Sequence, residues 1–296
     1  MNANPQSGIF AEGSQFYLAL EYRCTSPEKA RPALAAARAA AAKVKDTQCV
    51  FAFGGALLRA LAVADFPIRD FTPISGAAGL SAPASQHDLL IWIHGPRADT
   101  NFDLALAMHS ALHDCCTLAL EVAGFNYHAN RDMTGFIDGT ANPQQQEARD
   151  AALVPQDSPN AGGAYVLSQK FIHNLTAFNS LPVADQEKVI GRSKPDSTEL
   201  DPAQKPEDAH IARAEVTENG EELKIYRRSF PYGRVTEHGL YFLAFACDQH
   251  RFDAILKNMY GASGDGLHDR LLHFTRAQTG SYWFAPSARM LEDWLR

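Results

Sequence analysis

The sequence lacks the features that place a protein on nucleic acid or in a membrane. Its 27 Lys and Arg residues are outnumbered by 34 Asp and Glu, and the net charge is -7. This deficit of positive charge argues against binding to phosphate backbones or anionic lipid. No run of about 18 apolar residues is free of charge, and the N-terminus shows no secretory or twin-arginine signal. We therefore expect a soluble cytoplasmic protein that acts on small molecules.

Cysteine is scarce, and its spacing excludes the motifs that are built from it. The five cysteines are Cys24, Cys49, Cys115, Cys116 and Cys247. They form no C-x-x-C pair and no C-x-x-C-H haem-attachment motif, and their odd number implies no disulfide framework. Cys247 could bind haem as a thiolate, but a buried strand cysteine that acts as a small apolar side chain is the commoner case.

Length and composition predict a folded protein of two domains or one large one. The 296 residues are 46% hydrophobic and 21% charged, which is ordinary globular usage. Apolar residues alternate over 16–24, as on a half-buried strand, and the Ala-rich segment 27–45 predicts a helix. Further strands are expected at 49–53, 88–94 and 116–125, with a helix at 101–114. The first half thus reads β-α-β-β-α-β.

The periodic pattern stops over 127–163, where Asn, Asp, Gly, Pro and Gln dominate, and it restarts at residue 164. Strands are then expected at 164–171, 211–216, 223–228, 240–246 and 271–284, and helices at 175–190 and 251–260. Two copies of one unit predict a duplicated ferredoxin-like α+β fold, in which each antiparallel sheet is covered by helices. We expect domains at 1–130 and 164–296, joined by a connecting segment at 131–163.

The aperiodic segment contains a candidate site at residues 134–143, TGFIDGTANP. Glycines on both sides of Phe-Ile-Asp make the backbone turn tightly, so Asp138 is presented on a constrained loop. Taken alone, an aspartate in such a loop is more often one that caps its own loop through an Asx-turn.

Basic and imidazole side chains supply further candidates. His210 stands at the entry to the expected strand 211–216, where it could bind a transition metal or haem iron, or simply be a hydrogen-bonded histidine. Alternation puts Arg227 and Arg228 on opposite faces, so one should point inward toward an anion while the other meets solvent. The alternative is an edge arginine paired with a surface carboxylate. Arg192 follows a helix and either binds an anionic group or complements the helix dipole.

Two other patterns are weak as sites. His109 and His113 share a helix face, but the Glu that follows the first His in helical zinc sites is absent. Gly261, Gly264 and Gly266 form no G-x-G-x-x-G pattern and precede a helix-like segment, so a turn is expected there.

The GFIDGT loop, His210 and the YRRSFPYG segment, in that order, resemble the dye-decolorizing peroxidase family. The likeness is greatest to its short bacterial members, the B or P subclass. G-x-x-D-G is the signature of this family. The segments YVLSQKFIHNL, VIGRSK, YFLAFACD and TGSYWFAPS extend the resemblance over nearly the whole chain.

The resemblance implies a pair of ferredoxin-like domains, with one non-covalent haem b per chain held by the C-terminal domain. It implies that His210 is the proximal iron ligand and that Asp138 and Arg227 are catalytic residues over the distal face. The other residues that it assigns to cofactor binding are Arg192 at a propionate, Asp269 behind His210, Leu243 and Phe245 lining the distal pocket, and Ser229. Some members carry Asn at the position of Ser229, which leaves open how Asp138 and Arg227 share proton handling.

The implied activity is reduction of hydrogen peroxide through a ferryl intermediate, coupled to one-electron oxidation of bulky aromatic or dye-like substrates. Electrons would pass through surface aromatics, for which Trp92, Trp283, Trp294 and several tyrosines are candidates. The alternatives are a haem carrier or iron-release protein without peroxide turnover, and a haem-free module. The reductant is open between a dye-like aromatic, a porphyrin precursor and manganese. The family's tendency to assemble implies a homo-oligomer. The C-terminal EDWLR does not resemble the encapsulin-targeting tail of some members, so we expect none.

Overall fold

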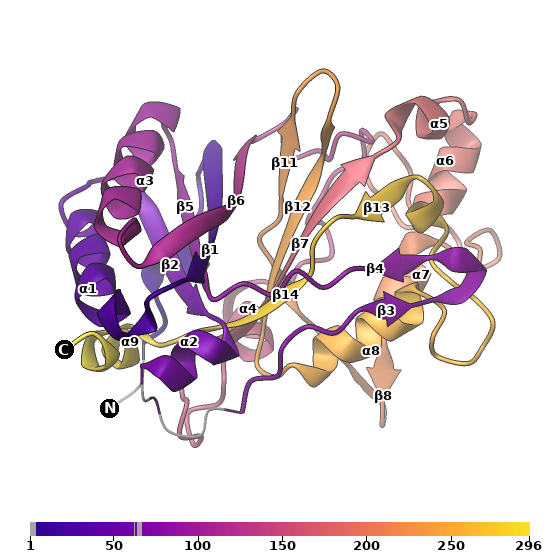
Figure 1. Cartoon of the computed structure of the whole chain (residues 1–296). Helices are drawn as coiled ribbons and strands as arrows, with labels where there is room; N and C mark the ends of the chain where they lie inside the picture. Colours follow the sequence, from indigo (N-terminus) through magenta and orange to yellow (C-terminus); the bar gives the residue numbers. More distant parts are fainter. Residues whose placement is uncertain (1–3, 62, 64–66) are drawn as a thin grey trace.

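Two antiparallel sheets, one in each half of the chain, form the fold in the computed structural model, which describes residues 4–61, 63 and 67–296 (Figure 1). Their strand orders are β2-β5-β1-β6 and β14-β7-β12, with β10 and β11 both pairing with β12. In each sheet the first strand of the half lies between the last strand and the third, which is the ferredoxin-like order. The two sheets join where Phe284 on β14 pairs with Phe53 on β2. The predicted duplicated α+β fold is confirmed.

The N-terminal sheet follows the sequence pattern closely. Its strands are β1 (Phe16–Cys24), β2 (Gln48–Phe53), β5 (Leu89–Gly95) and β6 (Cys116–Phe125). Its long helices, α1 (Ala30–Ala41) and α3 (Ala98–Leu112), pack together on one face of the sheet (Figure 1). A short 3-10 turn, Pro27–Lys29, precedes α1 because Pro is suited to a first helical turn.

The connection from β2 to β5 crosses to the C-terminal half. It holds α2 (Gly55–Ala60), β3 (Ile74–Ser75), a 3-10 turn (Ala77–Gly79) and β4 (Ser81–Ala82). The Ala77 N–H donates to Tyr260 O at 2.8 Å, and the Ser85 N–H donates to Gly280 O at 2.9 Å. Figure 1 shows β3 and β4 lying along the C-terminal half. The two halves are therefore joined in two ways: by the β2–β5 connection, which contacts the C-terminal half, and by the pairing of β14 with β2.

The C-terminal half contains the second sheet and several short helices. The strands of this sheet are β7 (Ala164–His173), β10 (Tyr226–Arg227), β11 (Phe230–Gly233), β12 (His238–Ala246), β13 (Thr275–Ala277) and β14 (Ser281–Ala285). A separate two-stranded sheet is formed by β8 (Thr217–Glu218) and β9 (Glu221–Glu222). The helices of this half are α4 (Gln145–Ala152), α5 (Leu175–Asn179), α6 (Val183–Ile190), α7 (His210–Ala214), α8 (His250–Met259) and α9 (Ala288–Trp294). Among the described residues, none of the helices has the length and apolar character needed to cross a bilayer.

Three expectations for this half are corrected. Residues 211–216 do not form a strand: α7 is a helical turn, held where the buried Arg213 donates to Asn258 O. The expected helix 175–190 is two helices, because Pro182 cannot donate within a helix. The expected strand 271–284 is split into a 3-10 turn and two strands. A side chain at Gly280, between the two strands, would meet Pro83 O at 2.6 Å.

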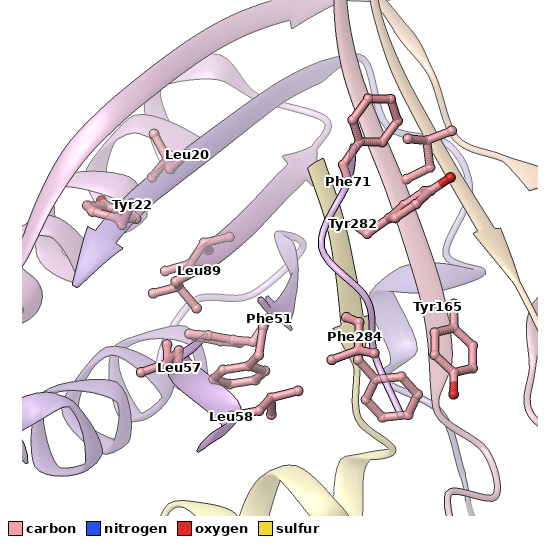
Figure 2. Packing of buried hydrophobic residues seen from close by; sticks show 14 of the residues in the cluster. Leu20, Tyr22, Phe51, Leu57, Leu58, Phe71, Leu89, Tyr165, Tyr282 and Phe284 are labelled. Carbon is pink, nitrogen blue, oxygen red and sulfur yellow. The ribbon is translucent and has the colours of Figure 1, made fainter. Parts of the chain in front are cut away.

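The larger apolar cluster runs through both halves (Figure 2). Tyr22, Phe51 and Leu89 from the N-terminal sheet belong to the same cluster as Tyr165 and Tyr282 from the C-terminal sheet. A second cluster occupies the opposite faces of the two sheets. Because both sheet faces are covered, most of the central strand residues are buried on either side.

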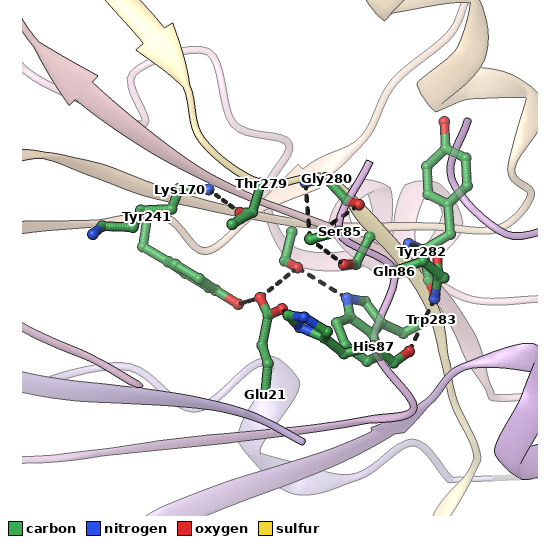
Figure 3. A network of polar contacts seen from close by, with 12 residues as sticks. Glu21, Ser85, Gln86, His87, Lys170, Tyr241, Thr279, Gly280, Tyr282 and Trp283 are labelled. Atoms are coloured by element: carbon green, nitrogen blue, oxygen red, sulfur yellow. Dashed lines mark hydrogen bonds and ion pairs between the residues drawn. The ribbon is translucent and has the colours of Figure 1, made fainter. Parts of the chain in front are cut away.

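A buried polar network ties β1 to the C-terminal sheet (Figure 3). The fully buried Glu21 accepts hydrogen bonds from Tyr241 Oη at 2.7 Å and Ser168 Oγ at 3.1 Å, and its other oxygen lies 2.7 Å from His87 Nδ1. Trp283 Nε1 donates to Ser168 Oγ at 2.9 Å. Three side chains thus contact the Glu21 carboxylate directly, and Trp283 in turn supports one of them, Ser168.

Replacing Glu21 with leucine is expected to lower the free energy of unfolding by about 3–5 kcal/mol, because three buried donors lose their acceptor. Glu21→Gln should cost less, since its amide oxygen still accepts from Tyr241 and Ser168. Denaturant titration of the wild type and both variants measures the difference. Equal stability of Glu21→Leu and the wild type would show that the network does not hold the halves together.

Candidate active site

A cavity with largely apolar walls lies between the C-terminal sheet and helices α6, α7 and α8. Its apolar lining includes Leu167 and Phe171 of β7, Leu240 and Phe242 of β12, Ile211 of α7 and Met259 of α8. Polar side chains enter this lining from loops, a strand and the start of a helix, and they include Asp138, Arg192, His210, Arg227 and Asp269. Apolar walls with a few converging polar groups are typical of a ligand site.

His210 and Asp269 form a buried pair in the cavity wall. His210 is the first residue of α7, and its Nδ1 lies 2.7 Å from Asp269 Oδ2. Asp269 is fully buried, and its other oxygen accepts from the Leu271 N–H at 2.8 Å. Burial lowers the pKa of His210, but the Asp269 carboxylate raises it more, so the net pKa lies above its ordinary value. Because Asp269 occupies Nδ1, Nε2 is the nitrogen that His210 can offer to a ligand.

The loop that carries Asp138 is fixed at several points. Gly135 and Gly139 have φ values of 88° and 83°, the left-handed region that favours glycine. The Asp138 N–H donates to Asn130 O at 2.8 Å, so the aspartate backbone is held by the loop itself. Asp138 therefore stands between two glycine turns, as the motif predicts.

Asn142 joins this loop to β10. Its Nδ2 donates to Arg227 O at 2.9 Å, and its Oδ1 accepts from the Arg227 N–H, also at 2.9 Å. These two hydrogen bonds to the backbone of Arg227 hold the Asp138 loop next to β10, and Asp138 and Arg227 line the same cavity. Asn142 lies within the TGFIDGTANP motif, but its role depends on a partner 85 residues away. Sequence reasoning singled out the motif and missed this residue.

Electrostatics at Asp138 are set by two opposing effects. Burial raises the pKa of Asp138, while the Arg227 guanidinium lowers it, and the net pKa lies above the ordinary value. The Asp132 carboxylate adds to the rise. The cationic Arg227 therefore limits how far the pKa of Asp138 can rise.

A second histidine and aspartate line the same cavity. His173 Nε2 lies 3.1 Å from Asp132 Oδ1, and His173 Nδ1 lies 2.7 Å from Thr275 Oγ1. Burial raises the pKa of Asp132, but His173 and the Thr134 hydrogen bonds outweigh it and bring the pKa to about 2. Both ring nitrogens of His173 are occupied, which distinguishes it from His210. Neither Asp132 nor His173 was singled out from the sequence.

A polar cavity adjoins the apolar one. Four residues line both cavities: Asp138, Gly139, Arg227 and Ser229. The rest of the polar cavity comes from loops near the N-terminus and from residues around β11, among them Ser14, Gln15, Asn126 and Pro231. The acid and the guanidinium thus stand where a polar space meets an apolar one.

Arg192 and Ser229 lie in the cavity wall. Arg192 follows α6, donates to Ser197 O at 3.0 Å and lies 3.6 Å from Glu199. Its position just beyond the C-terminal end of α6 also fits the alternative that its positive charge complements the helix dipole. The hydroxyl of Ser229 accepts from the Leu243 N–H at 3.3 Å.

Leu243 and Phe245 are on the other face of β12, and the expectation that they line the pocket is corrected. Both belong to the apolar cluster behind the sheet, where Phe245 contacts Trp92 with ring centroids 6.1 Å apart. Strand alternation gives the cavity face to Leu240 and Phe242 instead.

Arg228, the neighbour of Arg227, is half-buried and contacts protein groups rather than standing fully in solvent. Its guanidinium donates to Ala11 O at 2.5 Å and to Tyr226 Oη at 3.1 Å, and it lies 5.4 Å from the Trp92 ring centroid. Trp92 and Trp283 are fully buried, so neither is a surface aromatic. Trp294 packs against Phe53.

The other sequence patterns stay outside the cavity. His109 Nδ1 lies 3.4 Å from Tyr22 Oη, and His113 Nδ1 contacts Ser110 O at 2.7 Å. Within the described part of the chain, no three His, Cys, Asp or Glu side chains gather as a metal site. Cys247 is outside the cavity lining and contacts Asp248. Gly261, Gly264 and Gly266 all have positive φ, as residues of a turn.

Comparison with known proteins identifies the family. The models described as Dyp-type peroxidase, N-terminal and Dyp-type peroxidase, C-terminal match residues 20–126 and 129–290. A dye-decolorizing peroxidase of Mycolicibacterium paratuberculosis is 39% identical over 217 residues, which are 72% of this chain and 61% of that protein. The chain thus spans a little under two thirds of the length of this curated relative.

Solved structures match over the whole chain. A putative Dyp-type peroxidase from Shewanella oneidensis has a TM-score of 0.93 at 32% identity and covers 99% of both chains. A variant of DypB from Rhodococcus jostii RHA1, solved in complex with haem, has a TM-score of 0.89 at 32% identity and covers 95% of this chain and 96% of that one. The resemblance read from the sequence is confirmed: the chain belongs to the Dyp-type peroxidase family.

Proposed function

We propose that the protein is a haem peroxidase that reduces hydrogen peroxide and oxidises bulky aromatic or dye-like molecules in one-electron steps. One observation carries the proposal: His210, held by the buried Asp269, shares an apolar cavity with Asp138 and Arg227. The relatives support it, since one is named a dye-decolorizing peroxidase and another is a haem complex.

The cavity residues fit a haem b. His210 would bind the iron through Nε2, because its Nδ1 is taken by Asp269. Apolar walls from β7, β12 and α8 suit the macrocycle, and Arg192 would pair with a propionate. When bound, the haem supplies an iron that accepts the oxidising equivalents of peroxide and releases them one electron at a time.

The protein side chains would manage protons and charge. Asp269 would accept a hydrogen bond from Nδ1–H of His210, which makes the imidazole a stronger donor to a metal. Asp138 would take a proton from one peroxide oxygen and return it to the other, directly or through one water. Arg227 would stabilise the negative charge on the departing oxygen. The polar cavity, which both residues line, would give peroxide and water access to them.

A haem carrier or iron-release protein is the alternative, and it is not favoured. Binding alone does not require an acid and a guanidinium fixed beside each other, yet Asn142 bonds the backbone of Arg227 twice. The test is stopped-flow mixing of the ferric haem protein with one equivalent of peroxide. We expect a fast change of the absorption spectrum, followed by recovery when a dye is added. A spectrum that does not change would favour the carrier, and purified protein without colour would favour the haem-free module.

Several expectations stay predictions. They are the domain boundaries at 1–130, 131–163 and 164–296, assembly as a homo-oligomer, cytoplasmic location and the identity of the reductant. Electron transfer through aromatic residues also stays a prediction. Because Trp92 and Trp283 are buried, the partly exposed Trp294 is the tryptophan that could pass electrons at the surface.

The peroxide reaction is expected to slow in acid. Burial raises the pKa of Asp138 above its ordinary value, so the carboxyl is protonated at a higher pH than a free aspartate. Only the ionised form accepts a proton, and the rate should therefore fall by up to about tenfold per pH unit below that pKa. Stopped-flow rate constants against pH test this. In Asp138→Asn the rate should be lower throughout and lose this acid limb; an unchanged limb would assign the titration to another group.

A further inference from the structure

Three cysteine sulfurs gather at the outer end of β1 and β6, away from both cavities. Cys24 Sγ lies 2.9 Å from Cys116 Sγ, and Cys115 Sγ lies 3.7 Å from Cys116 Sγ. None of the three residues lines either cavity. The proposed peroxidase function gives this cluster no role.

A β-bulge sets the pairing of the two nearest cysteines. From Phe16 to Glu21 the register of β1 with β6 is regular, with Glu21 opposite Leu120. The register then shifts by one residue, so that Tyr22 pairs with Leu118. Without this shift Cys24 would face Thr117, whereas with it Cys24 faces Cys116. Bulges re-aim side chains in this way, and here the result is a matched pair of thiols.

The backbone geometry already suits a disulfide. Directly opposed residues on antiparallel strands have Cα atoms roughly 4.5–5.5 Å apart, within the range of roughly 4.4–6.8 Å that disulfides span. The N–H groups of Thr25 and Ser26 donate to Cys115 O at 2.8 and 3.1 Å, which holds the two strand ends together. Cys115 directs its own Sγ toward Leu112 O. The strands therefore need no large movement to bring Cys24 and Cys116 into bonding contact.

We propose that Cys24 and Cys116 form a reversible cross-strand disulfide when hydrogen peroxide accumulates. The Cys24 sulfur attacks one peroxide oxygen, the O–O bond breaks, and Cys24 sulfenic acid and one water form. The Cys116 sulfur then displaces the hydroxyl of the sulfenic acid as a second water. Two thiols lose two protons and two electrons, and one peroxide is reduced to two waters.

Exposure decides which thiol reacts first. Cys24 is partly exposed, whereas Cys115 and Cys116 are 1% and 3% exposed. The contact with Cys24 and burial raise the pKa of the Cys116 thiol, and burial raises that of Cys115 to about 12. Low exposure and a raised thiol pKa both disfavour attack of Cys115 or Cys116 on peroxide. Cys24 therefore reacts first, and Cys116 then attacks the sulfenic acid of Cys24.

The disulfide would link β1, the first strand of the N-terminal sheet, covalently to β6, its last strand. The two residues are 92 positions apart, and closing a long loop restricts the unfolded chain strongly. We expect oxidation to raise the thermal midpoint by roughly 5–10 °C.

The test uses the purified full-length protein, reduced and then treated with excess hydrogen peroxide. Maleimide labelling of the denatured protein should detect five thiols before treatment and three after it. Peptide mapping should find Cys24 linked to Cys116, and dithiothreitol should restore the two thiols. No loss of thiols, a linkage between other cysteines, or sulfinic acid at Cys24 without a link would overturn the proposal.

Matched variants keep this result separate from haem chemistry. Cys49→Ser removes a thiol on β2 and should still lose two thiols to peroxide, whereas Cys24→Ser and Cys116→Ser should form no intramolecular link and gain no thermal shift. The stopped-flow reaction of the haem is measured on the same preparations and should be unchanged in all three. Loss of the link alone would leave the peroxidase proposal intact, and loss of the haem reaction alone would leave the disulfide intact.

Discussion

Replacing His210 with alanine is expected to abolish haem binding and with it the Soret absorption band. The imidazole is the group with a ring nitrogen free to bind iron and a carboxylate fixed behind it, at 2.7 Å. Its loss leaves Asp269 buried without its partner, so the variant must also be checked for folding by far-UV circular dichroism. The measurement is the ratio of Soret to protein absorbance after purification with added haem.

His173→Ala is the matched control, because His173 lines the same cavity but has both ring nitrogens engaged. It should keep the Soret band. A His210→Ala protein with a normal haem content and spectrum would show that another residue is the ligand. Restoration of the band by added imidazole would support the assignment, since the free ligand fills the space that the side chain leaves.

The parts of the fold that could be read from the sequence are those with strong local patterns. Strands β1 and β6 begin and end where the alternation of apolar residues predicts. Helix α7 was missed because its five residues are too few to show a helical period. Contacts with Asn258, 45 residues from Arg213, hold that turn. Tertiary contacts therefore determine the conformation around His210.

The same distinction separates the site residues that were found from those that were missed. Asp138 lies between glycines in one motif, so its local sequence reveals it. The roles of Asn142 and His173 depend on partners 85 and 41 residues away, and neither partner leaves a trace in the local pattern. Alternation correctly puts Leu243 and Phe245 on a shared face of β12. Because both faces of that strand are buried, composition cannot tell which one meets the cavity.

Replacing Arg227 with leucine is expected to leave haem bound but to slow the peroxide reaction by about 10²–10³-fold. The side chain lines the cavity beside Asp138, while the iron ligand assigned here is on another element, so haem retention should not depend on it. The guanidinium has two effects that act together. In the proposed reaction it would stabilise charge on the departing oxygen, and it lowers the pKa of Asp138. The measurement is the second-order rate constant for peroxide by stopped flow.

Arg228→Leu tests whether position or mere positive charge matters. Arg228 is the next residue and carries the same charge, but it donates to Ala11 O and lies against Trp92. Its loss should slow the reaction far less than loss of Arg227. Asn142→Ala should fall between the two, because it keeps the guanidinium but frees the backbone that positions it. Equal rates in the two arginine variants would mean that long-range charge, rather than a guanidinium fixed at the oxygen, drives the reaction.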